Sequence, residues 1–115
     1  MAVKNRSTIQ FNVGMDENSI PEEISWSAEG SEKGGTQEAK GMMIALYDEK
    51  EENTLRIDLW KKDMMVEEMM KFTCQNIITL ADSFARATGE EAYAEEIREF
   101  GKSIAVKMGV LGPKK

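Results

Sequence analysis

The chain has 115 residues, enough for one domain with a single hydrophobic core. Fifteen Lys and Arg against 21 Asp and Glu give a formal net charge of −6, which opposes binding to nucleic acid or to anionic lipid. The chain contains no histidine, so the usual acid–base side chain at neutral pH and the commonest metal ligand are both missing. Cys74 is the single cysteine, which excludes an internal disulfide and is typical of a reducing compartment. Because no apolar run reaches the length of a signal-peptide core or a membrane span, we expect a cytoplasmic protein.

Two segments near the N-terminus predict a β-hairpin. Apolar and polar residues alternate over residues 8–15 and again over residues 24–28, the period of strands with one buried face. The stretch between them collects turn formers and ends in Pro21, which cannot donate to a sheet ladder. Trp26 lies on the apolar side of the second strand, so we expect it in the core. The glycine-rich, polar segment 29–35 that follows is predicted to be a mobile loop.

Residues 36–47 fit two patterns. Apolar residues recur at helical spacing along the segment, whereas Met43, Ala45 and Tyr47 also alternate as in a strand. A helix is favoured because Thr36 can cap it and because most of the segment consists of good helix formers. We therefore predict a short helix here, with a strand as the alternative.

A further strand is predicted over residues 55–60. It follows an acidic turn over residues 48–53, which lacks the ligand spacing and central glycine of a calcium loop. Alternation places three aliphatic residues on one face of the strand and Arg56, Asp58 and Trp60 on the other. Arg56 would keep Asp58 ionised, which favours structural pairing over a catalytic role. A tryptophan on the polar face requires either a covering helix or an exposed apolar patch of the kind that marks partner sites.

Two long helices are predicted at the C-terminal end. Residues 63–87 carry an apolar stripe opposite a polar one, and Asp63 can cap this helix. Thr88 and Glu91 have the spacing of a capping box, so a second helix over residues 90–108 follows almost directly.

The apolar faces of these helices have two features that require close neighbours. Gly101 lies on the apolar side of the second helix, where glycine costs about 1 kcal/mol relative to alanine, and close approach of another backbone would offset that cost. Cys74 and Ile78 widen the stripe of the first helix, which indicates cover by a second helix or by a second subunit. A homodimer would also cover the edges of a small sheet.

The methionines suggest a partner surface. Nine are present, six of them in three adjacent pairs, and flexible thioethers line adaptable binding grooves but also fill ordinary cores. The helical pattern places Met70 in the core, so Met64 and Met65 are the best candidates for a surface role. No catalytic, cofactor-binding or metal-binding residue is predicted. The candidate partner-binding residues are Arg56, Asp58, Trp60, Met64 and Met65.

Four segments resemble the gliding-motility protein GldC family of Bacteroidetes. They are residues 21–29 (PEEISWSAE), 38–48 (EAKGMMIALYD), 53–72 (NTLRIDLWKKDMMVEEMMKF) and 80–89 (LADSFARATG). The resemblance covers nearly the whole chain, and its most specific part is the Leu-Arg-Ile-Asp-Leu-Trp core. Lys61, where this family would have a threonine, is a small departure.

The sequence predicts a single α+β domain over residues 1–115, with frayed ends at residues 1–6 and 109–115. A small antiparallel sheet of about three strands is expected to be packed by the two long C-terminal helices and one short helix. The resemblance implies a cytoplasmic accessory protein that acts with other gliding or secretion proteins and is linked to type IX secretion. It implies no enzyme and brings no cofactor, while the charge and the lack of a long apolar run predict no nucleic-acid partner and no membrane insertion. The alternative is a client- or small-ligand-binding module, such as an acidic holdase-type chaperone for secretion substrates.

Overall fold

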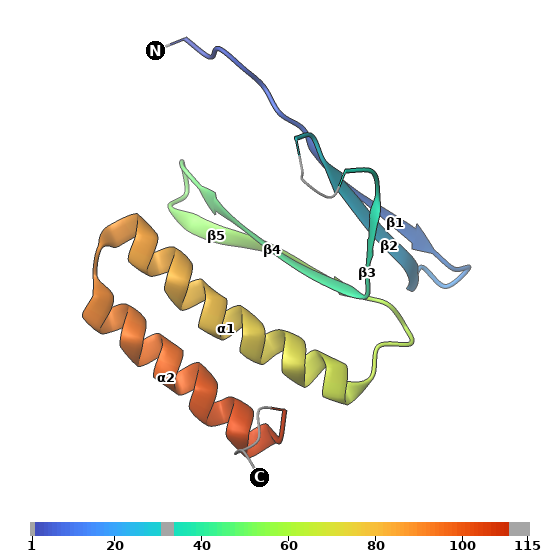
Figure 1. Cartoon of the computed structure of the whole chain (residues 1–115). Helices are drawn as coiled ribbons and strands as arrows, with labels where there is room; N and C mark the ends of the chain where they lie inside the picture. Colours follow the sequence, from blue (N-terminus) through green and yellow to red (C-terminus); the bar gives the residue numbers. More distant parts are fainter. Residues whose placement is uncertain (1, 31–33, 111–115) are drawn as a thin grey trace. The chain divides into compact units, whose positions relative to one another are not determined.

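The computed structural model describes residues 2–30 and 34–110 of the chain. They divide into two compact units, Met1–Met64 and Met65–Lys115. In the described residues, the first unit holds five antiparallel strands in two small sheets and the second holds two long helices (Figure 1). The predicted α+β class and the two C-terminal helices are thereby confirmed. The central part of the predicted mobile loop (31–33) and most of the predicted frayed C-terminus (111–115) lie outside the described residues, as does residue 1.

The first sheet confirms the predicted N-terminal hairpin. Phe11 lies opposite Trp26 and Val13 opposite Ile24, so that the apolar residues of both strands share one face. Ile24 is buried and Trp26 is half-buried. The strands stand in the order β1-β2-β3, with the bounds β1 (Ile9–Met15), β2 (Pro21–Ala28) and β3 (Gln37–Ala39).

The prediction of a short helix over residues 36–47 was wrong. The segment forms β3 and then β4 (Gly41–Asp48), which pairs antiparallel with β5 (Asn53–Trp60) in a second, two-stranded sheet. The physical reason is strand pairing, which satisfies the backbone groups of each strand: β3 pairs with β2, and β4 pairs with β5 with apolar residues of both strands in register. The cross-strand pairs on that face are Met42 with Leu59, Ile44 with Ile57, and Leu46 with Leu55.

The acidic segment between β4 and β5 is a turn, as predicted. The Glu51 N–H donates to Asp48 Oδ2 at 2.7 Å, and the Glu52 N–H donates to the Asp48 carbonyl at 2.8 Å. Asp48 therefore closes the hairpin through its own side chain and backbone.

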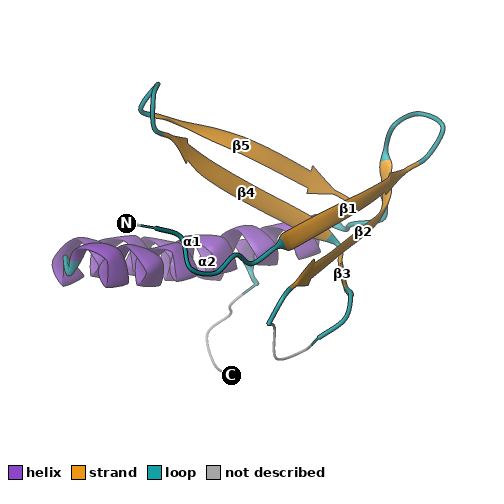
Figure 2. Ribbon diagram, turned by 90° about the horizontal axis from the view of Figure 1, so that it is seen from above, coloured by secondary structure: helices purple, strands orange, loops and turns teal. Residues whose placement is uncertain are grey.

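The second unit is an antiparallel helical hairpin of α1 (Val66–Thr88) and α2 (Glu91–Met108), and the two helices lie side by side in Figures 1 and 2. Gly101 is buried, and a Cβ added there would lie 2.8 Å from Ile78 Cγ1. Gly101 thus has close neighbours, but they are the side chains of Ile77 and Ile78 on α1 rather than the other backbone that was predicted. Small side chains fill the buried positions of the hairpin, which are Cys74, Ala81, Ala94, Gly101 and Ala105.

Both predicted caps were wrong. The N-cap of α1 is Met65 rather than Asp63, and its N–H donates to Glu68 Oε1 at 2.8 Å, so the glutamate in the first turn satisfies the helix end. Thr88 is the last residue of α1, and Glu90 is the N-cap of α2. The Thr88 hydroxyl accepts from the Glu90 N–H at 3.0 Å, which stabilises the connection instead of capping α2.

Candidate functional site

Lys62 holds the end of β5 to the β1–β2 turn. Its backbone N–H donates to the Pro21 carbonyl at 3.0 Å. Its ammonium group lies 3.1 Å from Asp16 Oδ2 and 2.9 Å from Glu22 Oε1. Lys62 thus joins the β1–β2 hairpin to the β4–β5 hairpin, through both its backbone and its side chain.

Asp16 organises the turn that Lys62 contacts. Its Oδ1 accepts from the N–H groups of Ile20 at 3.0 Å and Asn18 at 2.8 Å. The Ile20 hydrogen bond, followed by that of Lys62, holds the pKa of Asp16 below its usual range. In return, Glu22 first and then Asp16 raise the pKa of Lys62. Both groups therefore stay charged at neutral pH and fix the turn against the end of β5.

An open cavity of about 230 Å³ lies at this junction. Two large apolar side chains in its wall remain accessible, since Trp60 is 52% exposed and Ile20 is 42% exposed. Asp58 and Lys62 add one charge of each sign. The lining residues are Ser19, Ile20, Pro21, Asp58, Leu59, Trp60 and Lys62.

Arg56 and Asp58 form an ion pair on the strand that carries Trp60. Arg56 Nε lies 3.0 Å from Asp58 Oδ2, and Arg56 Nη2 lies 2.9 Å from Asp58 Oδ1. This bidentate geometry confirms the predicted structural pairing of Asp58 and the shared face of the two residues. The pair also fixes the Asp58 carboxylate beside Trp60 in the wall of the cavity.

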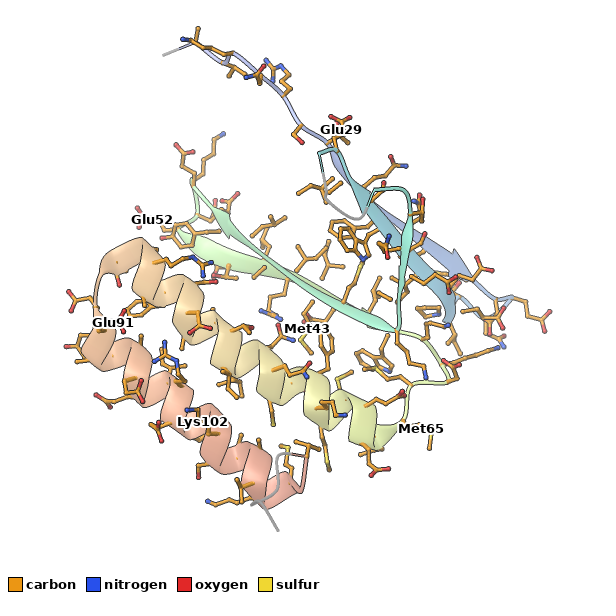
Figure 3. All side chains as sticks on the ribbon, in the orientation of Figure 1. Glu29, Met43, Glu52, Met65, Glu91 and Lys102 are labelled. Atoms are coloured by element: carbon orange, nitrogen blue, oxygen red, sulfur yellow. The ribbon has the colours of Figure 1, made fainter. Side chains whose placement is uncertain are left out.

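Neither of the two predicted methionines is among the residues that line the cavity. Met64 is half-buried, and its N–H donates to the Lys61 carbonyl at 3.0 Å in the turn after β5. Met65 is exposed and precedes α1 in the other compact unit (Figure 3). Of the predicted set, the structure therefore brings Trp60 and Asp58 together in one wall, with Arg56 attached through its ion pair.

The residues of this site that the sequence reasoning missed include Asp16, Ile20 and Lys62. Asp16 carried a usable signal, because the segment Asp-Glu-Asn-Ser at residues 16–19 is rich in turn formers, and an aspartate at the start of a turn can accept backbone N–H groups through its carboxylate. Ile20 had only its place in that turn. Lys62 carried no signal in the sequence, because its partner Asp16 is 46 residues away in the chain.

The wall of the cavity combines an exposed aromatic side chain with charged groups of both signs. Within residues 2–30 and 34–110, no group of three or more His, Cys, Asp or Glu side chains could hold a metal ion. Neither helix of the described chain is long and apolar enough to cross a membrane. An exposed tryptophan beside an acid and a lysine offers apolar area together with hydrogen-bonding groups of both polarities.

These elements define a small α+β protein in which five antiparallel strands in two sheets precede a helical hairpin within the described residues. A comparison with known protein families gives a match over most of the chain. The chain belongs to the GldC-like family, whose description is "gliding motility-associated protein GldC-like" and whose profile matches residues 21–110. Membership implies a role associated with gliding motility and confirms the family resemblance. Neither curated proteins nor solved structures gave a match to the chain.

Proposed function

We propose that this protein is a cytoplasmic accessory factor of gliding motility, without enzymatic activity, that acts by contacting other gliding proteins and is linked to the type IX secretion machinery. The observation that carries the proposal is the half-exposed Trp60 beside an open cavity, in a chain whose family is associated with motility. The net charge of −6 favours a protein partner over nucleic acid or anionic lipid.

The proposed contact places an apolar side chain of the partner in the cavity next to Trp60. Aromatic residues beside a pocket are frequent hot spots, and truncating one costs about 2 kcal/mol or more of binding free energy. Asp58 and Lys62 line the same cavity and would orient the partner's backbone or a polar group. The Arg56 ion pair keeps the Asp58 carboxylate in place before the partner arrives.

The test compares two aromatic truncations in the native host. Trp60→Ala removes the proposed anchor, and Tyr47→Ala removes an exposed aromatic side chain at the other end of the same hairpin. Each tagged variant is crosslinked in cells and captured from membrane and soluble fractions separately. We expect Trp60→Ala to lose both gliding and the captured gliding or secretion components, while Tyr47→Ala keeps them. Equal behaviour of the two variants would remove the proposed surface.

A second candidate, a holdase for secretion substrates, is favoured by the aliphatic face of the β4–β5 hairpin. Leu55 is 55% exposed and Ile57 is 48% exposed, and their cross-strand partners are also aliphatic. An accessible apolar face on an acidic protein is suited to unfolded clients, and the negative charge keeps such a protein soluble.

This candidate is tested by suppression of aggregation of a chemically unfolded client. Ile57→Gln makes the aliphatic face more polar, whereas Ala45→Gln makes the same change on the opposite face of the hairpin. A holdase would lose activity with Ile57→Gln, keep it with Ala45→Gln, and keep it with Trp60→Ala. Absence of any suppression at molar excess of the wild-type chain would eliminate this reading.

A further inference from the structure

β1 is an edge strand without the usual protection against pairing. Among residues 2–30 and 34–110 it pairs with β2 alone. Its sequence, IQFNVGM, contains no charged residue and no proline, although natural edge strands commonly carry lysine, proline or a central bulge to prevent pairing. The irregularity in its pairing lies at the C-terminal end, between Gly14 and Met15. All but one of its residues are exposed, the exception being the half-buried Val13.

The pairing with β2 decides which backbone groups β1 offers at its free edge. The Glu29 N–H donates to the Thr8 carbonyl at 3.1 Å, and the register continues from there without a shift to Gly14. Since hydrogen-bonded pairs alternate along an antiparallel ladder, the even-numbered residues of β1 bond to β2. Ile9, Phe11 and Val13 therefore direct their N–H and C=O groups away from the sheet.

We propose that this edge pairs antiparallel with β1 of a second copy of the chain, about a two-fold axis at Asn12. In that register Phe11 of each copy lies opposite Val13 of the other. The N–H and C=O groups of both residues point away from β2, so that the two residues can form a hydrogen-bonded pair across the axis. The apolar residues of both copies share one face, and Gln10, Asn12 and Gly14 share the other. The two three-stranded sheets become one continuous sheet.

Charges beside the strand favour a second copy over an unrelated extended peptide. Lys4 and Arg6 precede β1, and Glu17 follows it in the turn, next to Asp16, whose charge is already paired with Lys62. In an antiparallel pair of β1 strands, the basic residues before β1 of each copy lie beside the acidic turn after β1 of the other copy. The same electrostatic attraction therefore occurs twice, once on each side of the two-fold axis. This compensates locally for the net charge of −6 that each copy brings. The proposal is independent of Trp60 and of the partner suggested for it.

The register predicts which single cysteine will crosslink two copies. Across the axis, the two Asn12 residues form a pair without mutual hydrogen bonds, with Cα atoms about 4.5 Å apart, which is within the range of a disulfide. The two Gln10 residues are offset by four positions, about 13 Å along the strand. Under mild oxidation of the full chain we expect Asn12→Cys to give a disulfide-linked dimer, and Gln10→Cys and the wild-type chain, with its buried Cys74, to stay uncrosslinked. No crosslink with Asn12→Cys, or equal crosslinking by both variants, would overturn this register.

A second variant tests the edge itself. Val13→Pro removes an N–H that points away from β2, a position at which proline leaves the internal ladder intact. Light scattering from about 1 to about 100 µM, the range expected of a small interface, should show a dimer for the wild-type chain and for Trp60→Ala. Val13→Pro should be monomeric with unchanged circular dichroism. A monomeric wild-type chain across this range, or a folded Val13→Pro variant that remains dimeric, would overturn the proposal, and if this variant does not fold the two cysteine variants decide.

Discussion

Replacing Gly101 by alanine should destabilise the helical hairpin, although the same change at an exposed helical site would stabilise it by about 1 kcal/mol. A Cβ at this position would lie 2.8 Å from Ile78 Cγ1 and 3.0 Å from Ile77 Cγ2, well inside the roughly 3.5 to 4.0 Å at which carbon atoms attract. Both isoleucines are β-branched and restricted at χ1 in a helix, so neither can turn aside. Such overpacking typically costs about 1 to 3 kcal/mol, and two contacts this short place Gly101→Ala in the upper part of that range. After the gain in helix propensity is subtracted, the net loss expected for Gly101→Ala is about 1 to 2 kcal/mol.

The assay is urea and thermal unfolding followed by the helical circular dichroism signal. The expected loss corresponds to a fall in melting temperature of about 4 to 8 °C for a chain of this size. Ser103→Ala, an exposed change on the same helix, is the control and should be neutral or slightly stabilising. In an Ile78→Ala background, Gly101→Ala should lose part of its penalty, because the nearest carbon is gone while Ile77 Cγ2 remains 3.0 Å from the added Cβ. Stabilisation by Gly101→Ala alone would refute the close approach of the helices.

Three further results are expected. Hydrogen bonds depress the pKa of Asp16 in the folded chain. The ionised carboxylate therefore stabilises the strands at pH values above its ordinary pKa, and this stabilisation is lost as pH falls through the folded pKa. Asp16→Asn should make the stability of the folded chain less dependent on pH in the acid range, as followed by tryptophan fluorescence. Arg98→Met should lower the midpoint of unfolding because Arg98 Nη2 lies 2.9 Å from Asp82 Oδ1, and the loss should shrink in an Asp82→Asn background. Cys74, which is buried, should react slowly with a thiol reagent in the folded chain and rapidly in urea, and a fast reaction in both states would contradict its position between the helices.

Sequence reasoning succeeded where one strand or helix carries its own pattern. The strands 8–15 and 24–28 alternate strictly and are joined by a short turn, so the hairpin could be predicted from local information. It failed over residues 36–47 because helix propensity there is an average over the segment, whereas the structure is decided by pairing: residues 37–39 pair with β2 and residues 41–48 pair with β5. The aliphatic register between β4 and β5 is invisible until both segments are considered as strands.

The helix ends and the candidate site also depend on contacts that residue type alone does not predict. Asp63 and Thr88 have the right residue types for caps, but Glu68 satisfies the start of α1 from inside the helix. At the site, Trp60 and Asp58 could be proposed from alternation on one strand. Lys62 could not, because its role depends on the β1–β2 turn, which the chain reaches 46 residues earlier.

The buried residues of the two units explain why so much apolar surface stays available for partners. In the helical hairpin the buried positions hold only small residues, whereas the large side chains of Tyr93 and Phe100 stay at the exposed surface of α2. In the sheets, Ile24 is buried while Ile9 and Ile57 remain exposed. Each partner that covers such side chains stabilises the folded chain by mass action. If β1 pairs with a second copy as proposed, the melting temperature of the wild-type chain should therefore rise with protein concentration, and that of Val13→Pro should not.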